Sequence, residues 1–214
     1  MVKLNESAKQ KLVELIARYQ AAKSEIQARL SEFKRVPREE YFYEMCFCIC
    51  TPQSKARHAF VVVEMLKQRD FLHHPFDPLE IVGNREHYIR FHNQKSLNLL
   101  RLQEQWQEIE REITLDIQVE AKRDRLTDSV RGIGMKEAAH FLRNIGEFGV
   151  AILDRHILKH LTLLGVIDEY PTGMNRKQYL EIEAQWKEFC HKTAIPMEEM
   201  DLLFWSMETG EILK

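Results

Sequence analysis

Two side chains of this sequence, Lys136 and Asp154, have the types that nucleophilic and electrostatic catalysis require. Lys136 follows a glycine-flanked turn at residues 132–135 and stands at the start of a predicted helix, where the helix dipole disfavours a positive charge. That position suits an amine nucleophile, because only the neutral amine attacks. Asp154 ends an apolar run eighteen residues later and is predicted to cap the next helix. A carboxylate fixed by capping bonds could stabilise positive charge that develops on a substrate.

The turn itself has features of an anion site. Gly132 and Gly134 allow successive backbone N–H groups to point outward beside a helix N-terminus, which suits a phosphodiester. Between Lys122 and Arg143 the chain has six Lys or Arg residues, Arg131 among them, against three Asp or Glu. This local charge of +3, in a chain of net charge −2, predicts a patch that contacts a DNA backbone. A helix–turn–helix corner with a solvated charged face would explain the turn equally well.

The elements that position these residues are predicted to be helices. Apolar residues recur at three- and four-residue steps, and no alternating strand pattern with a hairpin turn is present. Pro37 and Pro52 are each expected to start a helix. The predicted helices cover about residues 5–34, 37–51, 53–69, 87–109, 112–119, 124–131, 135–145, 154–164, 175–192 and 196–208, with a short one after residue 78. The predicted fold class is all-α.

Composition sets the remaining limits. The 214 residues are 44% hydrophobic and 30% charged, so the chain can bury a large core without disulfides or metals. The N-terminus has no apolar signal-peptide segment, and no apolar run is long enough to span a bilayer. We therefore expect a cytoplasmic, intracellular protein, associated with the nucleoid if it binds DNA.

The cysteines and histidines do not predict a metal site. Cysteines stand at positions 46, 48, 50 and 190, and alternate positions on a helix point in nearly opposite directions, so buried thiols are expected. His156 and His160 lie one helical turn apart, but no third ligand recurs on their face. We expect no metal and no cofactor.

Residues 132–157, GIGMKEAAHFLRNIGEFGVAILDRHI, resemble the helix-hairpin-helix glycosylases of base-excision repair. They are most similar to the archaeal-type 8-oxoguanine DNA glycosylase/lyases. ICTPQSKA at 49–56, YIRFHNQKS at 88–96 and the terminal WSMETGEILK are similar to segments of the same family, and the resemblance spans roughly residues 35–214. Family members with an iron–sulfur cluster carry four cysteines in a compact C-terminal loop, a spacing that this chain lacks.

The resemblance implies a two-lobed fold with the active site in the groove between the lobes. Residues 1–36 would form an N-terminal helix that packs on the C-terminal lobe. Residues 37–131 would form a central helical bundle, 132–146 the hairpin turn and second hairpin helix, and 147–214 the C-terminal helical lobe.

The same resemblance implies a bifunctional enzyme that acts as a monomer on double-stranded DNA containing 8-oxoguanine, with no membrane and no obligate protein partner. Lys136 would attack C1′ of the damaged nucleotide, expel the base and form a Schiff base, and β-elimination would cut the strand 3′ to the lesion. Asp154 would stabilise the oxocarbenium-like charge. Arg131, Gly132 and Gly134 would hold the DNA backbone.

Further residues are implied in base recognition. Lys214 would read the edge of the base, with Trp205 as a wall of the pocket, and Phe91 would belong to the pocket or the DNA face together with Arg90 and Lys95. For Trp205, packing in the core is an equally good explanation.

Gln53 would fill the gap that the flipped nucleotide leaves, although it could also be an ordinary residue at a helix start. The chain has Thr-Pro-Gln-Ser at 51–54, where relatives more often have an Ala-Asn pair. The base preferred opposite the lesion therefore does not follow from the resemblance.

Three other functions remain open. A non-catalytic helix-hairpin-helix module would bind DNA without chemistry, a glycosylase could act on a different damaged base, and a helical interaction protein would have no DNA affinity. The pairing of Lys136 with Asp154 favours an enzyme, because a binding module needs neither residue.

Overall fold

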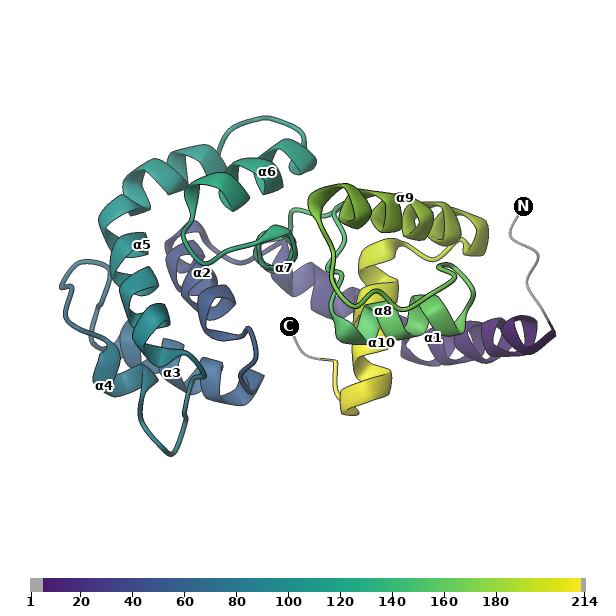
Figure 1. Cartoon of the computed structure of the whole chain (residues 1–214), viewed down its shortest axis with the longest axis horizontal. Coiled ribbons are helices and arrows are strands. Elements are labelled where there is room, and N and C mark those ends of the chain that lie inside the picture. Colours follow the sequence, from purple (N-terminus) through teal and green to yellow (C-terminus); the bar gives the residue numbers. More distant parts are fainter. Residues whose placement is uncertain (1–5, 213–214) are drawn as a thin grey trace. The chain divides into compact units, whose positions relative to one another are not determined.

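The computed structural model describes residues 6–212, and every regular element within them is a helix (Figure 1). The α-helices are α1 (Glu6–Phe33), α2 (Tyr41–Cys50), α3 (Ala56–Gln68), α4 (Leu79–Val82), α5 (His92–Ile113), α6 (Val119–Ser129), α7 (Met135–Asn144), α8 (Arg155–Leu163), α9 (Arg176–Thr193) and α10 (Met197–Thr209), with a 3-10 turn η1 (Arg38–Glu40) before α2. The predicted all-α class is confirmed. Within the described part of the chain, no helix has the length and apolarity needed to cross a membrane.

The chain divides into two compact units. The central unit is Val36–Ile145 and contains α2 to α7. The terminal unit combines Met1–Arg35 with Gly146–Lys214 and contains α1 and α8 to α10. The hairpin turn and α7 thus belong to the same unit as α2 to α6.

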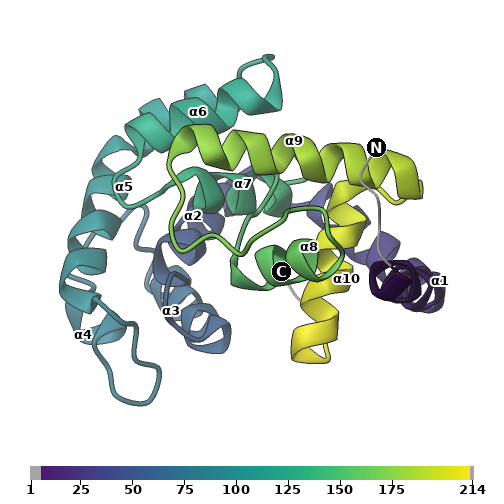
Figure 2. The ribbon, with the colours of Figure 1, turned by 45° about the vertical axis from the view of Figure 1, so that its right-hand side comes forward.

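The central unit is built around α2, whose sequence YFYEMCFCIC is apolar on nearly every side. This helix packs against α3, α5 and α7 (Figure 2). Phe42 is fully buried, and its ring meets that of Trp106 on α5 edge to face, with 5.2 Å between centroids. The predicted burial of all four thiols is confirmed, and burial raises the pKa of Cys50 to about 12.

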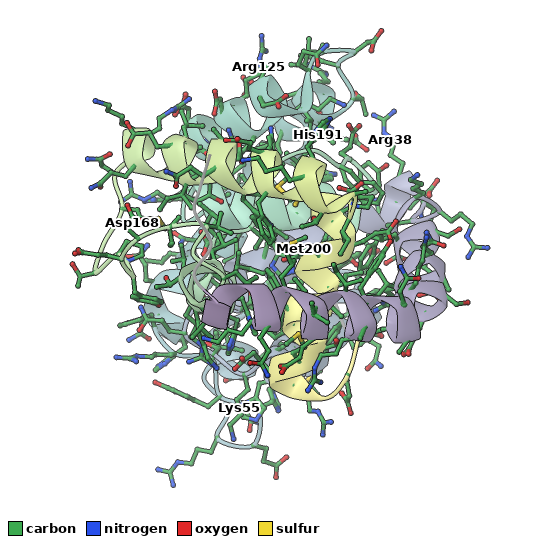
Figure 3. The ribbon with its side chains drawn as sticks, turned by 90° about the vertical axis from the view of Figure 1, so that its right-hand side faces the viewer. Arg38, Lys55, Arg125, Asp168, His191 and Met200 are labelled. Carbon is green, nitrogen blue, oxygen red and sulfur yellow. The ribbon has the colours of Figure 1, made fainter. Side chains whose placement is uncertain are left out.

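The terminal unit is organised by α10, which packs against α1, α8 and α9. Figure 3 shows Met200 on α10 where this helix passes α9 and α1. Met200 is fully buried, and the indole N–H of Trp186 on α9 lies 3.3 Å from its sulfur. The Tyr19 hydroxyl on α1 donates to Glu199 on α10 at 2.6 Å, and burial together with this bond raises the pKa of Tyr19 to about 12.

One expected helix start is wrong. Pro52 begins a turn and not a helix, because Ser54 N–H donates to Thr51 O at 2.9 Å and Gln53 adopts a positive φ of 56°. Proline at the second position of a β-turn followed by a positive φ is the pattern of a type II turn. Helix α3 therefore begins only at Ala56.

Two further boundaries differ from the expected ones. Helix α5 starts at His92, not at residue 87, because Phe91 takes a left-handed conformation with φ of 61°. It then continues to Ile113, and the two short helices expected at 112–119 and 124–131 are replaced by the single helix α6. The break falls at residues 114–118, between two helices that pack against each other.

Candidate active site

The hairpin turn joins α6 to α7 in the central unit. Gly132 has φ of 90°, a conformation that L side chains rarely adopt, and a Cβ at this position would collide with the side-chain amide of Asn98. Ile133 is buried and anchors the turn, whereas Arg131 and Gly132 are exposed. Gly134 is the N-cap of α7 with an extended backbone. The turn is therefore exposed at Arg131 and Gly132, whereas the N–H groups of Ile133 and Gly134 donate to Val130 O at 3.2 Å and to Glu137 Oε2 at 3.3 Å.

Lys136 lies in the first turn of α7 and its side chain is 34% exposed. Its ammonium pairs with Glu137 Oε1 at 2.9 Å, while Glu137 Oε2 accepts the Gly134 N–H at 3.3 Å. Glu137 thus both caps the helix and holds the amine. The predicted buried stripe of this helix, Ala138, Leu142 and Ile145, is confirmed.

The expected surplus of positive charge around the hairpin is wrong for the surface. Lys122, Arg123 and Arg143 are buried, so three of the six counted cations are withdrawn from solvent. Three cations stay accessible, Arg125, Arg131 and Lys136, and Lys136 is paired with Glu137. Contacts to a DNA backbone would therefore depend on the exposed part of the turn at Arg131 and Gly132 and on single side chains.

Asp154 is the N-cap of α8 in the terminal unit, as predicted. Its Oδ1 accepts the backbone N–H groups of His156 at 2.8 Å and Ile157 at 2.9 Å. Because Oδ1 receives both capping bonds, the carboxylate is fixed by its own helix. Asp154 is only partly buried.

Two buried side chains of α9 hold the extended segment that leads to Asp154. Glu183 Oε2 accepts the Ala151 N–H at 2.7 Å. The Tyr179 hydroxyl donates to Ala151 O at 2.5 Å and accepts the Leu153 N–H at 3.3 Å. These three bonds satisfy backbone groups that water cannot reach, and they fix the direction in which the chain enters α8.

Comparison with known proteins decides the family. Residues 26–195 match the family model described as 8-oxoguanine DNA glycosylase. The chain belongs to this family. The 8-oxoguanine DNA glycosylase/AP lyase of Fusobacterium nucleatum is 40% identical over 207 residues, which cover 92% of this chain and 94% of the relative. The enzyme of the same name from Methanocaldococcus jannaschii is 35% identical, with 88% and 91% covered.

Solved glycosylase structures share the fold. The 8-oxoguanine DNA glycosylase of Thermotoga maritima has a TM-score of 0.84 at 28% identity, and the match covers 97% of this chain and 100% of that one. The M. jannaschii 8-oxoguanine glycosylase/lyase in complex with 15mer DNA containing 8-oxoguanine has a TM-score of 0.80 at 30% identity, with 94% and 100% covered. The family resemblance inferred from residues 132–157 is thereby confirmed.

In this glycosylase fold, Trp205 lies beside the helix that Asp154 caps. Its ring is half-buried and meets the His156 ring at 5.2 Å between centroids. Trp205 is therefore not a fully buried core residue.

The carboxylate of Glu208, near the end of α10, lies close to three basic side chains of α8. Glu208 lies 2.7 Å from Lys159 Nζ, 3.0 Å from His160 Nε2 and 3.5 Å from His156 Nδ1. Sequence reasoning missed Glu208, although acidic and basic residues in two terminal helices were a usable signal. Lys159 and the histidines lower the pKa of Glu208, whereas burial lowers the pKa of His160.

The remaining predicted residues are placed as follows. Gln53 is exposed in the turn before α3, and Phe91 is 51% exposed with the Arg90 guanidinium 4.9 Å from its ring centroid. Both residues lie in the central unit with Lys136, and a shallow hollow on this unit is lined by Phe91 and residues around it. Lys214 lies outside the described residues. Lys95 does not belong to a DNA-facing surface, because it is only 6% exposed.

Proposed function

We propose that this chain is a bifunctional DNA repair enzyme that excises 8-oxoguanine and then cleaves the strand 3′ to the abasic site. The observation that carries the proposal is the accessible amine of Lys136, held at the N-terminus of α7 directly behind a glycine turn with exposed backbone. A module that only bound DNA would need the turn but not the amine. The relatives named 8-oxoguanine DNA glycosylase/AP lyase support the same activity.

The first chemical step replaces the base by the lysine. The Lys136 ammonium leaves its ion pair with Glu137 and gives up a proton, for which the Glu137 carboxylate at 2.9 Å is a suitable acceptor. The neutral amine attacks C1′, the bond from C1′ to the base nitrogen breaks, and the base leaves with its electron pair and takes up a proton. The Asp154 carboxylate stabilises the positive charge on the sugar during this exchange.

The second step cuts the strand. Opening of the sugar ring gives an imine between Lys136 and C1′. The Asp154 carboxylate or a water molecule takes a proton from C2′, and the protonated imine accepts the electron pair. The 3′ phosphate then leaves as the C3′–O bond breaks, and hydrolysis of the imine releases the lysine. The enzyme needs no metal or cofactor for either step, since the protonated imine supplies the electron sink.

DNA binding positions the sugar for both steps. A base in a duplex is out of reach, so the nucleotide is flipped at a cost of a few kcal/mol. Gly132, Gly134 and Arg131 hold the phosphate backbone, and Gln53 fills the gap in the stack.

The flipped base is read by three side chains. Phe91 and Trp205 contact it as walls of the pocket, and Lys214 recognises its edge. We further propose that the enzyme works as a monomer inside the cell, on the DNA of the nucleoid.

The test is an assay on end-labelled duplexes that contain one 8-oxoguanine or one guanine at the same position. We expect base release and strand cleavage without alkali only for the damaged duplex, and loss of both with Asp154→Asn. Binding without base release would favour the non-catalytic module, and release of another damaged base but not of 8-oxoguanine would contradict the proposed substrate.

A further inference from the structure

Lys95 is a charged side chain buried inside the central unit. It lies in the first turn of α5, on the same face as the buried residues Leu99, Leu102 and Trp106. Its ammonium donates to Cys50 O at 2.8 Å, to Pro52 O at 2.7 Å and to Ser54 Oγ at 3.4 Å. Three N–H donors thus meet three acceptors, all from the short segment between α2 and α3.

This segment contains a residue in an unfavourable conformation. Gln53 has φ of 56° although it carries a Cβ, and such a backbone persists only where surrounding contacts fix it. The acceptors of Lys95 lie on both sides of Gln53, at Pro52 and Ser54. The amide side chain of Gln53 itself is exposed.

Residues just before α5 also form hydrogen bonds with this part of the chain. Ser54 Oγ also accepts the Arg90 N–H at 3.0 Å, and His58 Nδ1 lies 3.2 Å from Tyr88 O. The turn and the start of α3 are therefore both held to residues 88–95, and Lys95 supplies a charged donor to the turn.

The charge makes this arrangement costly for the fold. Burial lowers the pKa of Lys95 to about 8, so at neutral pH the ammonium and its three donors persist in a desolvated place. The neighbouring Cys50 thiol is neutral because burial raises its pKa to about 12, so it supplies no counter-charge. A methionine would fill a similar volume without this cost. This indicates that the hydrogen bonds donated by Lys95 matter for more than packing.

We infer that Lys95 is a positioning residue that holds the Thr51–Ser54 turn so that the Gln53 side chain can enter the gap left by the flipped nucleotide. The inference rests on the proposed function. It assigns Lys95 no contact with DNA. Glu137 and Lys136 also act on the Lys95 ammonium electrostatically, so the part of its effect that passes through Gln53 is what a double-mutant cycle measures.

The test is a double-mutant cycle with Lys95→Met and Gln53→Ala in the full chain. Excision is measured under single turnover on a duplex with one 8-oxoguanine, and strand cleavage is measured on a duplex with a preformed abasic site. We expect each single variant to lose about tenfold in excision, equivalent to about 1.4 kcal/mol, and the double variant to lose no more than either. Cleavage at the preformed site should fall less, because no base has to be unstacked there.

The matched control is Lys122→Met, which removes another buried lysine of the same unit. This substitution should lower the free energy of unfolding, and its effect on the excision rate should be independent of Gln53→Ala. If Lys95→Met does not fold, Ser54→Ala is a less disruptive variant. It removes one acceptor of Lys95 and the acceptor of the Arg90 N–H.

The outcomes separate the two claims. The role of Lys95 would be overturned if the losses of Lys95→Met (or Ser54→Ala) and Gln53→Ala multiply in the double variant. It would also be overturned if Lys122→Met couples equally to Gln53→Ala. In both cases the excision activity of the wild type stands. A folded wild type that does not excise 8-oxoguanine would overturn the proposed function and this role with it.

Discussion

The carboxylate of Glu183 on α9 accepts a hydrogen bond from the backbone N–H of Ala151 at 2.7 Å, three residues before Asp154. Glu183 is only 4% exposed, so this bond lies in the interior of the terminal unit. A side chain 32 positions from Ala151 in the sequence therefore sets the path by which the chain reaches the proposed catalytic carboxylate.

Replacement of Glu183 by alanine should affect both stability and chemistry. The Ala151 N–H would lose its acceptor, which costs about 1–3 kcal/mol for a buried donor. The segment before Asp154 would then shift, and the rate of base excision should fall more than duplex affinity does. Glu183→Gln, which keeps an acceptor oxygen, is the control, and urea unfolding with single-turnover assays gives both readouts. A destabilised Glu183→Ala with a wild-type excision rate would disprove the positioning role.

Two substitutions of Asp154 separate its structural from its chemical role. Asn retains an oxygen for the N–H groups of His156 and Ile157, so Asp154→Asn should keep nearly all the stability, whereas Asp154→Ala should lose about 0.5–2 kcal/mol as a lost cap. Excision should fall by about a hundredfold or more in both, because both remove the charge. An Asp154→Asn variant with near wild-type excision would show that the residue serves only as a cap.

Substitution of Gly132 tests the geometry of the hairpin turn. Gly132→Ala combines a positive φ, which costs roughly 1–2 kcal/mol, with a collision against the Asn98 amide, so it should lower both stability and duplex affinity. Gly210→Ala measures the φ cost alone, since Gly210 has φ of 80° with nothing within 4 Å of the added Cβ. Adding Asn98→Ala to Gly132→Ala should relieve the collision, apart from the cost of Asn98→Ala itself. If Gly132→Ala costs no more than Gly210→Ala, the close approach of Asn98 is unimportant.

Acid should weaken the junction between α8 and α10. Lys159 holds the pKa of Glu208 below its ordinary value of 4.5, so the pairing stabilises the fold above that pH and is lost as pH falls through the lowered pKa. Burial lowers the pKa of His160 below 6.5, so protonation of His160 also costs stability in acid. The unfolding temperature of Glu208→Gln should lie below that of wild type at neutral pH, and the gap should close below about pH 4.5. A gap that does not change with pH would argue against the ion pair.

Much of the site follows from local sequence patterns. The apolar spacing of α7 places Lys136 off the buried stripe, and the apolar run before Asp154 predicts its capping position. Glu137 could have been found as well, because it stands three residues after the N-cap Gly134, where a capping box has its acidic residue.

Other features depend on distant partners and are not visible in local patterns. Gln53 keeps its positive φ in a turn that Lys95 bonds from a different helix, so the helix expected after Pro52 does not form. The spacing of Lys95 from Leu99 and Trp106 places it on the buried face of α5, but its charge favours the prediction of an exposed residue. No local pattern predicts that Lys122 is buried. A count of charges along the chain therefore assigns its positive charge wrongly to the surface.

The central claim is that the amine of Lys136 becomes covalently bound to the damaged sugar. Borohydride trapping tests it directly, because hydride reduces the imine to a stable amine that survives denaturing gels. Wild type, Lys136→Gln and the control Lys177→Gln, an exposed lysine on α9, would be incubated with a labelled duplex containing one 8-oxoguanine. We expect a covalent adduct with wild type and Lys177→Gln and none with Lys136→Gln. A full-strength adduct with folded Lys136→Gln would contradict the account, as would the absence of any adduct with a wild type that cleaves the strand.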